Sequence, residues 1–405
     1  MTSTLAETRL WDPDLYAGGI PHELFARLRV EDPVHWQDEP DGSGFWAVMR
    51  HADVREVNRD AETYSSARGG YLLEDHPEEH LEMFRMQMIG MDAPEHTRNR
   101  RMINRGFAPR RIDAMDSHLR DLARGIVDSI ADKGEVDFVS EVAAELPLLV
   151  ICELMGVPVE DRARIFELTN SLIGFDDPDF QTTPEAGQEA MAEMYLYAHG
   201  LVADRRDNPR DDIVSTLVHK EVDGERLSEA EIDVFFLLLA VAGNETTRNA
   251  TAQGMHALLT YPDQLAVLEA DRSLLASTAT EEILRWATPV IQFRRTVTRD
   301  TELGGKHIAA GDKVVMYYSS ANRDEAVFED PHRFDVRRSP NDHLAFGGGG
   351  PHYCLGANLA RMELRILFDE LLARLTNFEL AGEVRLLRSN FINGIKELPV
   401  SFSVR

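Results

Sequence analysis

Cysteine is scarce in this sequence. Of its 405 residues only two are cysteines, Cys152 and Cys354, and they form no C-x-x-C pair. This scarcity excludes a disulfide framework and a cysteine-based zinc or iron–sulfur site. It also fits a reducing compartment, so a cytoplasmic location is expected.

Long apolar segments are missing as well. The longest apolar run, VFFLLLAVAG at 234–243, is far shorter than the roughly 20 residues that cross a bilayer. The N-terminal stretch MTSTLAETRLWDPDLY lacks a positively charged region followed by an apolar run. Neither a transmembrane anchor nor a signal peptide is therefore expected.

The chain has far fewer basic than acidic residues. The chain has 43 Lys and Arg residues against 70 Asp and Glu, which gives a formal net charge of −27. Such a chain repels phosphate backbones and anionic lipids, so nucleic acid and membrane surfaces are excluded as partners. The sequence has no internal repeat or low-complexity linker, and it is long enough for a large core.

Most of the chain shows the helical spacing of apolar residues, which predicts a mainly α fold with small β-sheets (α+β). Residues 65–90 are predicted to be a loop, and its methionine-rich part suits a pliable apolar lining. The predicted helices include 115–132, 141–156, 159–173, 184–206, 211–219 and 357–377, and the β-rich portions lie near 46–50, 293–318 and 385–403.

One long apolar helix contains an anomaly. Ser228-x-x-Glu231 is a capping box that opens a helix reaching to about residue 260. In its middle, Ala242-Gly243-Asn244-Glu245-Thr246-Thr247 is rich in poor helix formers, and threonine hydroxyls can bond back to the preceding turn and bend the helix. This is either a simple kink with an exposed glutamate, or an acid and a hydroxyl placed for proton delivery.

A glycine-rich loop precedes the second cysteine. Gly347–Gly350 is followed by Cys354 and then by a helix start. Helix-start amides stabilise a thiolate, and glycines let a large flat group approach the backbone. A flexible loop with a buried structural cysteine remains the alternative.

Positive charge is concentrated in one short span. Six arginines lie between residues 98 and 111. They form either a solvated helix face or a site for an anionic group or acidic partner. A separate Glu282-x-x-Arg285 pair is a weak signal, since most such pairs are surface salt bridges.

Five motifs occur together in one order. These are the helix around His96–Arg100, the AGNETT segment, the Glu282/Arg285 pair, the Pro331–Phe334 stretch and the cysteine loop. This arrangement resembles the cytochrome P-450 family, the haem-thiolate monooxygenases, of the soluble bacterial type. Four tracts further resemble actinobacterial hydroxylases of sterols and methyl-branched lipids: GFDDPDF (174–180), VAGNETTRNA (241–250), SANRDEAVF (320–328) and FINGIKELPV (391–400).

The resemblance implies a single domain, 1–405, with haem b between the long central helix and the helix after the cysteine loop. Cys354 would be the axial iron ligand, and Glu245 and Thr246 would relay protons. Phe346 stands eight residues before Cys354, where the family places it seven before, so a different loop shape is expected. The other haem-site residues implied are His96, Arg100, Arg295 and His352 at the propionates, and Ala242, Gly243, Phe346, Gly347 and Gly356. Glu282, Arg285 and Arg333 would form a structural ion-pair cluster.

The resemblance also implies the reaction and its partners. O2 would be the co-substrate, with electrons from NAD(P)H through a ferredoxin reductase and a ferredoxin, and the enzyme would be a monomer. The substrate would be a methyl-branched lipid or sterol side chain, hydroxylated at its end. A polyketide or terpenoid hydroxylase and a non-catalytic haem binder are the alternatives. The expected substrate pocket comprises Met86, Met88, Met91, Leu238, Ala242, Val290, Phe293 and Ile392, and the expected ferredoxin face comprises Arg98, Arg101, Arg105, Arg110, Arg111, Arg361 and Arg365.

Overall fold

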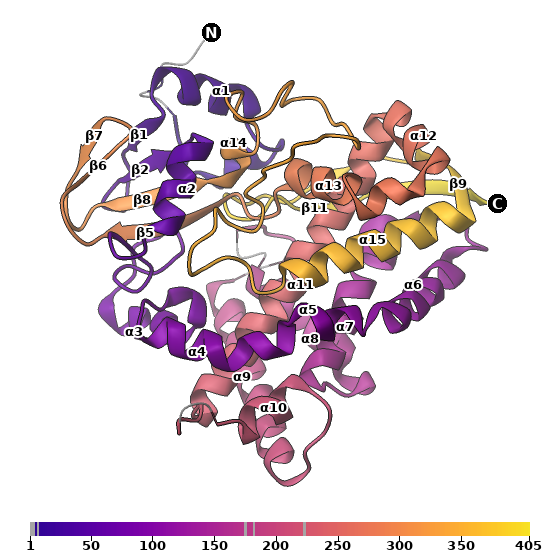
Figure 1. The fold of residues 1–405 in the computed structure, drawn as a ribbon, viewed down its shortest axis with the longest axis horizontal. Coiled ribbons are helices and arrows are strands. Elements are labelled where there is room, and N and C mark those ends of the chain that lie inside the picture. Colours follow the sequence, from indigo (N-terminus) through magenta and orange to yellow (C-terminus); the bar gives the residue numbers. More distant parts are fainter. Residues whose placement is uncertain (1–4, 6–7, 174–175, 181–182, 222–223) are drawn as a thin grey trace.

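The computed structural model describes residue 5 and residues 8–173, 176–180, 183–221 and 224–405. Helices predominate; most of the labelled strands lie on one side of the molecule, whereas strand β9 (Leu375–Leu380) lies on the opposite side, near the C-terminus (Figure 1). The helices are α1 (His22–Glu31), α2 (His51–Arg59), α3 (Glu78–Met86), α4 (Glu95–Ile103), α5 (Pro109–Asp113), α6 (Asp116–Ile130), α7 (Glu145–Met155), α8 (Arg162–Ile173), α9 (Pro184–Asp207), α10 (Ile213–His219), α11 (Glu229–Thr260), α12 (Pro262–Ala270), α13 (Ala279–Ala287), α14 (Tyr318–Ala321) and α15 (Ala357–Arg374).

The largest sheet has five strands in the order β1-β2-β8-β5-β3. Its β2–β8 pair is parallel, and its other pairs are antiparallel. The smaller sheets are β4-β12-β9, β10-β11 and β6-β7. The strands are β1 (Val34–Gln37), β2 (Phe45–Val48), β3 (Tyr64–Ser65), β4 (Glu135–Asp137), β5 (Gln292–Val297), β6 (Thr301–Leu303), β7 (Lys306–Ile308), β8 (Lys313–Tyr317), β9 (Leu375–Leu380), β10 (Arg385–Leu386), β11 (Ile395–Glu397) and β12 (Pro399–Val404).

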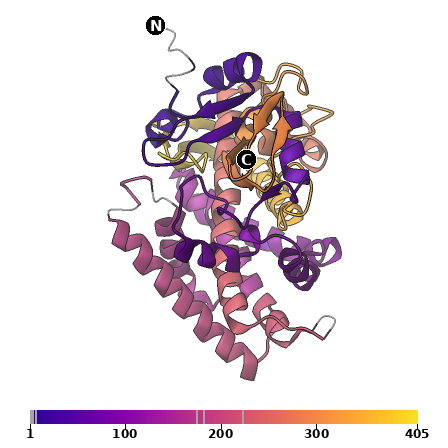
Figure 2. The same cartoon turned by 90° about the vertical axis from the view of Figure 1, so that its left-hand side faces the viewer.

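Helix α11 is the central element, and it crosses the molecule from end to end (Figure 2). The predicted capping box opens it: the Glu231 amide donates to the Ser228 hydroxyl at 3.3 Å, and the Ser228 amide donates to the Glu231 carboxylate at 2.8 Å. Helices α7, α8, α9, α13 and α15 pack against it, which buries most of its length. The predicted mainly α fold is therefore confirmed.

Two local predictions were wrong. The expected loop at 65–90 contains helix α3. Its first turn carries Glu78 and Glu79, whose negative charges interact favourably with the positive end of the helix dipole and stabilise the helix. The last long helix ends at Arg374, and Leu375 begins strand β9. Strand β9 pairs with β12, so tertiary pairing overrides the local helical pattern.

The main apolar core lies among the helices, and smaller clusters cover the five-stranded sheet. Cys152 is fully buried in the main core, as its apolar surroundings in the sequence indicate. Within the described part of the chain, none of the helices has the length and apolar character needed to span a bilayer.

Candidate active site

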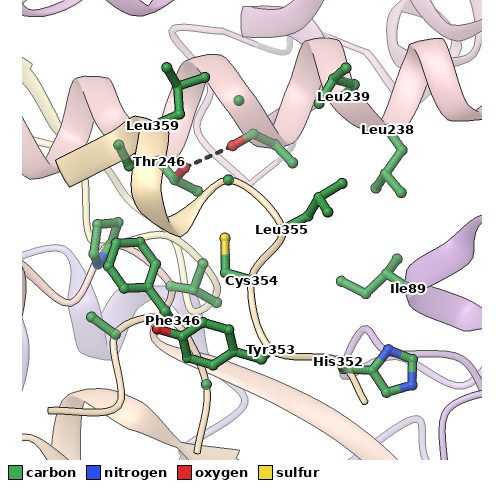
Figure 3. A pocket seen from close by; sticks show the side chains of 18 of the residues that line it. Ile89, Leu238, Leu239, Thr246, Phe346, His352, Tyr353, Cys354, Leu355 and Leu359 are labelled. Carbon is green, nitrogen blue, oxygen red and sulfur yellow. Dashed lines mark hydrogen bonds between the residues drawn. The ribbon is translucent and has the colours of Figure 1, made fainter. Parts of the chain in front are cut away.

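A cavity lies between α11, α15 and the cysteine loop. The space not filled by protein atoms amounts to about 1530 Å³, open solvent at the mouth included. In Figure 3 the Cys354 sulfur points into this space, with Thr246 and Leu238 of α11 around it. Two segments about 100 residues apart in the sequence thus form one site.

The Cys354 thiol lies at the start of α15. Cys354 is exposed to the cavity. Its separation from bulk solvent there raises the pKa of the thiol, while the backbone N–H groups of Gly356 and Ala357 and the guanidinium groups of Arg100 and Arg361 offset part of that effect. A thiol with a raised pKa is a poor nucleophile, but a bound metal cation deprotonates it outright. The setting suits a metal ligand better than a catalytic nucleophile.

The glycine loop is shaped by its contact with α2. Gly347, Gly349 and Gly350 have φ of +91°, +91° and +79°, which favour glycine. A Cβ on Gly348 would lie 2.8 Å from the Arg55 Cα, so this loop packs directly on the helix backbone. The glycines are thus needed for the close packing of the loop on α2, in addition to the predicted role of letting a flat group approach the loop backbone.

Phe346 keeps its place beside the sulfur despite the extra loop residue. Its ring lines the same cavity as Cys354 (Figure 3). The Cys354 amide donates to the Phe346 carbonyl at 3.0 Å, which closes the loop. On its other side, the Arg361 guanidinium lies 4.6 Å from the Phe346 ring centroid.

Two arginines and two histidines from distant segments meet at one end of the cavity. His96 and Arg100 come from α4, Arg295 from β5 and His352 from the cysteine loop. The two imidazole centroids are 4.2 Å apart, and Arg100 donates to the Tyr353 carbonyl. The His96 Nε2 atom is buried without a hydrogen-bond partner among the described residues.

This group of cations and donors fits a ligand with carboxylates. Among the described residues, no carboxylate lies within ion-pair distance of Arg100 or Arg295, although Arg295 is buried. Burial and the neighbouring arginines lower the pKa of His96 to about 4 and that of His352 to about 2, so both are neutral donors at pH 7. Buried guanidinium groups without a counter-ion are costly. Two propionates of a haem would supply the missing charge, and Cys354 would supply the metal ligand.

The predicted back-bond in α11 is present. The Thr246 hydroxyl donates to the Ala242 carbonyl at 2.7 Å (Figure 3). Ala242, Gly243 and Thr246 all line the cavity. The Thr246 oxygen therefore offers its lone pairs to the cavity.

Glu245 points away from the cavity. It is fully buried, so the alternative of an exposed glutamate at a kink was wrong. Its carboxylate pairs with Arg248, which donates to Asn170 of α8 at 2.6 Å. Burial raises the pKa of Glu245, and Arg248 offsets part of this rise. The structure thus places Glu245 and Thr246 on different sides of α11.

The predicted substrate residues divide into two groups. Met88, Leu238, Ala242, Val290 and Phe293 line the cavity. Three others do not: Met86 is exposed on α3, Met91 contacts Asn99, and Ile392 is buried and forms a β-bridge with Val290.

Further lining residues were not predicted. A detectable signal existed for Leu359 and Glu363, because their four-residue spacing places them on one face of the helix after the loop; Leu355 precedes that helix. Most of the others belong to elements that only the tertiary fold brings together; they include Asn58, Ile89, Phe107, Ile151, Phe235, Leu239, Thr247, Leu284, Tyr318 and Tyr353.

The structural ion-pair cluster has a different third member. Glu282 and Arg285 are fully buried and pair at 2.7 Å. Arg338 completes the cluster, with its Nε 3.1 Å from Glu282. Arg333 was predicted in this role, but its side chain is exposed and only its carbonyl accepts from Arg285, at 3.2 Å.

Much of the predicted ferredoxin face is engaged with acidic residues. Arg98 pairs with Glu225 and Glu231. The side chains of Arg101 and Arg110 are exposed, and that of Arg105 lies outside the described residues. The remaining pairs are Arg111 with Asp211, Arg361 with Glu281, and Arg365 with Asp116.

Comparison with known proteins agrees with this geometry. A family model for cytochrome P450 matches residues 157–389. The chain is 44% identical over 400 residues to a steroid C26-monooxygenase of Rhodococcus jostii, covering 96% of this chain and 84% of that protein. It is 46% identical over 410 residues to a methyl-branched lipid omega-hydroxylase of Mycobacterium tuberculosis, covering 98% and 95%. A solved cytochrome P450 of Mycobacterium marinum in complex with pseudoionone matches with a TM-score of 0.92 at 40% identity, covering 99% of both chains. This chain therefore belongs to the cytochrome P450 family and is a haem-dependent monooxygenase.

Proposed function

We propose that this monooxygenase hydroxylates the end of a methyl-branched lipid or of a sterol side chain. The observation that carries the proposal is the apolar part of the cavity wall. None of the residues that the first half of α11, residues 88–89 and residues 289–293 contribute to it has a polar side chain: Met88, Ile89, Phe235, Leu238, Leu239, Ala242, Gly243, Pro289, Val290 and Phe293. Such a wall accepts a branched hydrocarbon end and rejects a charged one.

The names of two relatives support the same substrate class. They are a steroid C26-monooxygenase and a methyl-branched lipid omega-hydroxylase, at 44% and 46% identity. The reaction is RH + O2 + 2 e⁻ + 2 H⁺ → ROH + H2O. It consumes two protons for each O2, so the protein must deliver protons into an apolar cavity.

The residues that would hold the haem are Cys354 on the iron and His96, Arg100, Arg295 and His352 at the propionates. Bound haem with a thiolate ligand supplies the activation of O2. The chain's own contribution is to keep the propionates neutralised, exclude bulk water and orient the substrate.

Proton delivery is assigned to the middle of α11. The Thr246 hydroxyl donates its hydrogen to the Ala242 carbonyl. Its oxygen is therefore free to accept a hydrogen bond from a proton donor in the cavity and to hold that donor in position. The Glu245 carboxyl would reach the cavity beside Thr246 only after its ion pair with Arg248 breaks. In this buried position the raised pKa of Glu245 favours the protonated carboxyl, the form that can donate a proton.

Electrons would come from NAD(P)H through a ferredoxin reductase and an acidic ferredoxin. The docking face would centre on Arg101 and Arg110, which are exposed. Reversing both charges should slow reduction at low salt by about tenfold, and the difference should vanish at high salt. The control is Arg164→Glu on α8, and equal rates in both variants would contradict the docking face. The expected working form is a cytoplasmic monomer with a single domain, 1–405.

The decisive experiment combines spectra with product analysis. The reduced carbon monoxide complex should show the red-shifted band of thiolate-ligated haem, and Cys354→His should lose it. Titration with sterols and methyl-branched lipids should shift the haem spectrum, and turnover should give terminal alcohols. Turnover restricted to a polyketide or terpenoid, or haem binding without any turnover, would overturn the proposed substrate class.

A further inference from the structure

One part of the cavity wall begins at a strained turn. Helix α13 ends at Ala287, and Thr288 has a φ of +36°, in the left-handed region that β-branched residues rarely adopt. The next residues along the chain belong to the cavity wall: Pro289, Val290 and Phe293. A strained residue persists only where its surroundings hold it. The course of this wall, residues 289–293, therefore depends on the contacts that hold the Thr288 turn.

Asn393 bonds to both chain neighbours of Thr288. Its side-chain Nδ2 atom donates to the Ala287 carbonyl at 2.6 Å. Its backbone N–H donates to the Pro289 carbonyl at 2.9 Å. The Thr288 hydroxyl is held separately by Asn322, which donates to it at 2.8 Å. Asn393 thus clamps the backbone on either side of the strained residue and reaches the first residue of the wall.

The segment that carries Asn393 runs alongside the wall. The Ile291 amide donates to the Phe391 carbonyl at 2.8 Å. Val290 and Ile392 form an antiparallel β-bridge. The wall and this segment are therefore joined residue by residue, so a displacement of one would displace the other.

Gln253 of α11 orients the clamp. Its Nε2 atom donates to the Asn393 Oδ1 atom at 3.2 Å, which directs the Asn393 Nδ2 atom to the Ala287 carbonyl. One turn earlier on α11, the buried Asn249 side chain accepts a hydrogen bond from the Ile395 amide at 3.3 Å. Two amide side chains thus tie the segment to α11, which itself lines the cavity.

We propose that Asn393, oriented by Gln253, is a positioning residue that determines which carbon of the bound chain is hydroxylated. Asn393 itself does not line the cavity. It acts through Pro289 and Val290, whose positions set how the hydrocarbon end lies in the cavity. The inference rests on the proposed function, the hydroxylation of a branched chain end.

The chemistry of a branched chain end makes this positioning necessary. The primary C–H bonds of its terminal methyl groups are stronger than the tertiary C–H bond at the branch carbon. A loosely held end therefore reacts at the branch carbon, and terminal hydroxylation requires a wall that holds a methyl group at the reacting position. A misplacement of about 1 Å costs up to roughly a hundredfold in rate. A small shift of the wall is thus enough to change the product.

The first test is structural and needs no turnover. Crystal structures of the haem-loaded wild type, Asn393→Ala and Gln253→Leu are compared over the Thr288 turn and the wall. In both variants the Cα atoms of residues 289–291 should move by more than about 0.5 Å, the tolerance of a productive site. In Asn393→Ala the φ of Thr288 should also relax toward negative values. A wall that stays in place in Asn393→Ala would overturn the inference.

The matched control is Asn390→Ala. Asn390 is buried in the same segment, but its side chain donates to the Trp11 carbonyl, at 2.7 Å, and not to the Thr288 turn. The wall should keep its wild-type position in this variant. An equal displacement in Asn390→Ala and Asn393→Ala would show that the wall follows the packing of the whole segment, which would contradict the clamp.

The second test identifies the alcohols formed from isopalmitic acid and from cholesterol, both of which end in a branch with two terminal methyl groups. Asn393→Ala should lower the ratio of terminal to branch-carbon alcohol by roughly tenfold. Gln253→Leu should lower it less. The double variant should match Asn393→Ala, because the two side chains act through one hydrogen bond. Dissociation constants from the haem spectral shift should stay at the wild-type values, since the wall keeps its apolar surface.

The alcohol ratio separates positioning from a purely structural role. Loss of stability alone lowers haem content and total product but leaves the ratio unchanged. An unchanged ratio in Asn393→Ala with normal haem content, or an equal fall in Asn390→Ala, would therefore refute the inference. A wild type that hydroxylates neither lipid would refute the proposed function instead, and the crystal structures would still decide whether Asn393 fixes the wall.

Discussion

The carbonyl oxygen of Asn58 lies 2.3 Å from the position that a Cβ on Gly350 would occupy. Asn58 is near the end of α2, so the cysteine loop rests directly on the backbone of this helix. Arg59 adds a bond from its Nε to the Gly348 carbonyl at 3.2 Å. The position of Cys354 therefore depends on α2, some 300 residues away in the sequence.

Gly350→Ala should disturb this contact severely. The new Cβ would collide with the Asn58 carbonyl, and the φ of +79° would be strained in any case. We expect a loss of at least about 2 kcal/mol in the free energy of unfolding, with reduced haem content. The measurements are chemical denaturation and haem quantification. Gly125→Ala, where a Cβ meets no atom within 4 Å, is the control and should be neutral or stabilising.

Arg338 and Arg333 should differ sharply when each is replaced by glutamine. Arg338 forms an ion pair with the fully buried Glu282. In Arg338→Gln the negative charge of Glu282 would therefore lose one of its positive partners. Arg333 is exposed, and the carbonyl that it contributes survives substitution. We expect a loss of about 3 kcal/mol for Arg338→Gln and less than about 1 kcal/mol for Arg333→Gln in thermal or chemical unfolding. Equal losses would contradict the assignment of Arg338 to the cluster.

The sequence carried the local signals of this site but not its long-range pairings. Thr246 and Ala242 were predictable because a hydroxyl and the carbonyl one turn earlier are neighbours on any helix. The role of Arg338 in the ion-pair cluster of Glu282 and Arg285 was not predictable. Arg333 and Arg338 are equally plausible partners of Glu282 in the sequence, and only the folded path of residues 323–343 decides between them. Glu245 was a mixed case: Arg248 lies three residues later on the same helix, so their ion pair is local, whereas the bond from Arg248 to Asn170 depends on how α8 packs on α11. Glu363 could have been found from its spacing to Cys354, but its burial could not.

Acid should destabilise the protein partly through Glu281. This carboxylate is mostly buried, and bonds from His343 and Arg361 outweigh its burial and lower its pKa from 4.5 to about 2. Because the folded pKa lies below the unfolded one, its contribution is fully present above about pH 4.5 and is lost as the pH falls toward 2. That contribution amounts to about 3 kcal/mol. Unfolding of Glu281→Gln should therefore vary less with pH in this range than unfolding of the wild type.

The control for this measurement is Glu383→Gln, which replaces an exposed glutamate in the segment between β9 and β10. It should follow the wild-type acid unfolding curve. An identical pH dependence in Glu281→Gln and the wild type would show that the contacts of Glu281 do not stabilise its charged form.

Thr246→Ala should separate oxygen consumption from hydroxylation. The variant lacks the hydroxyl that faces the cavity, so a proton donor is no longer held there, and reduced oxygen should leave as peroxide. We expect product formed per O2 to fall by roughly tenfold or more, since a positioned acid–base group contributes factors of that size or larger. Thr246→Ser, which keeps a hydroxyl, should recover most of the ratio. Thr260 makes the same type of bond to the His256 carbonyl, at 2.8 Å and on the exposed end of the same helix. Thr260→Ala should therefore stay coupled, and tight coupling in Thr246→Ala as well would remove this hydroxyl from the proton route.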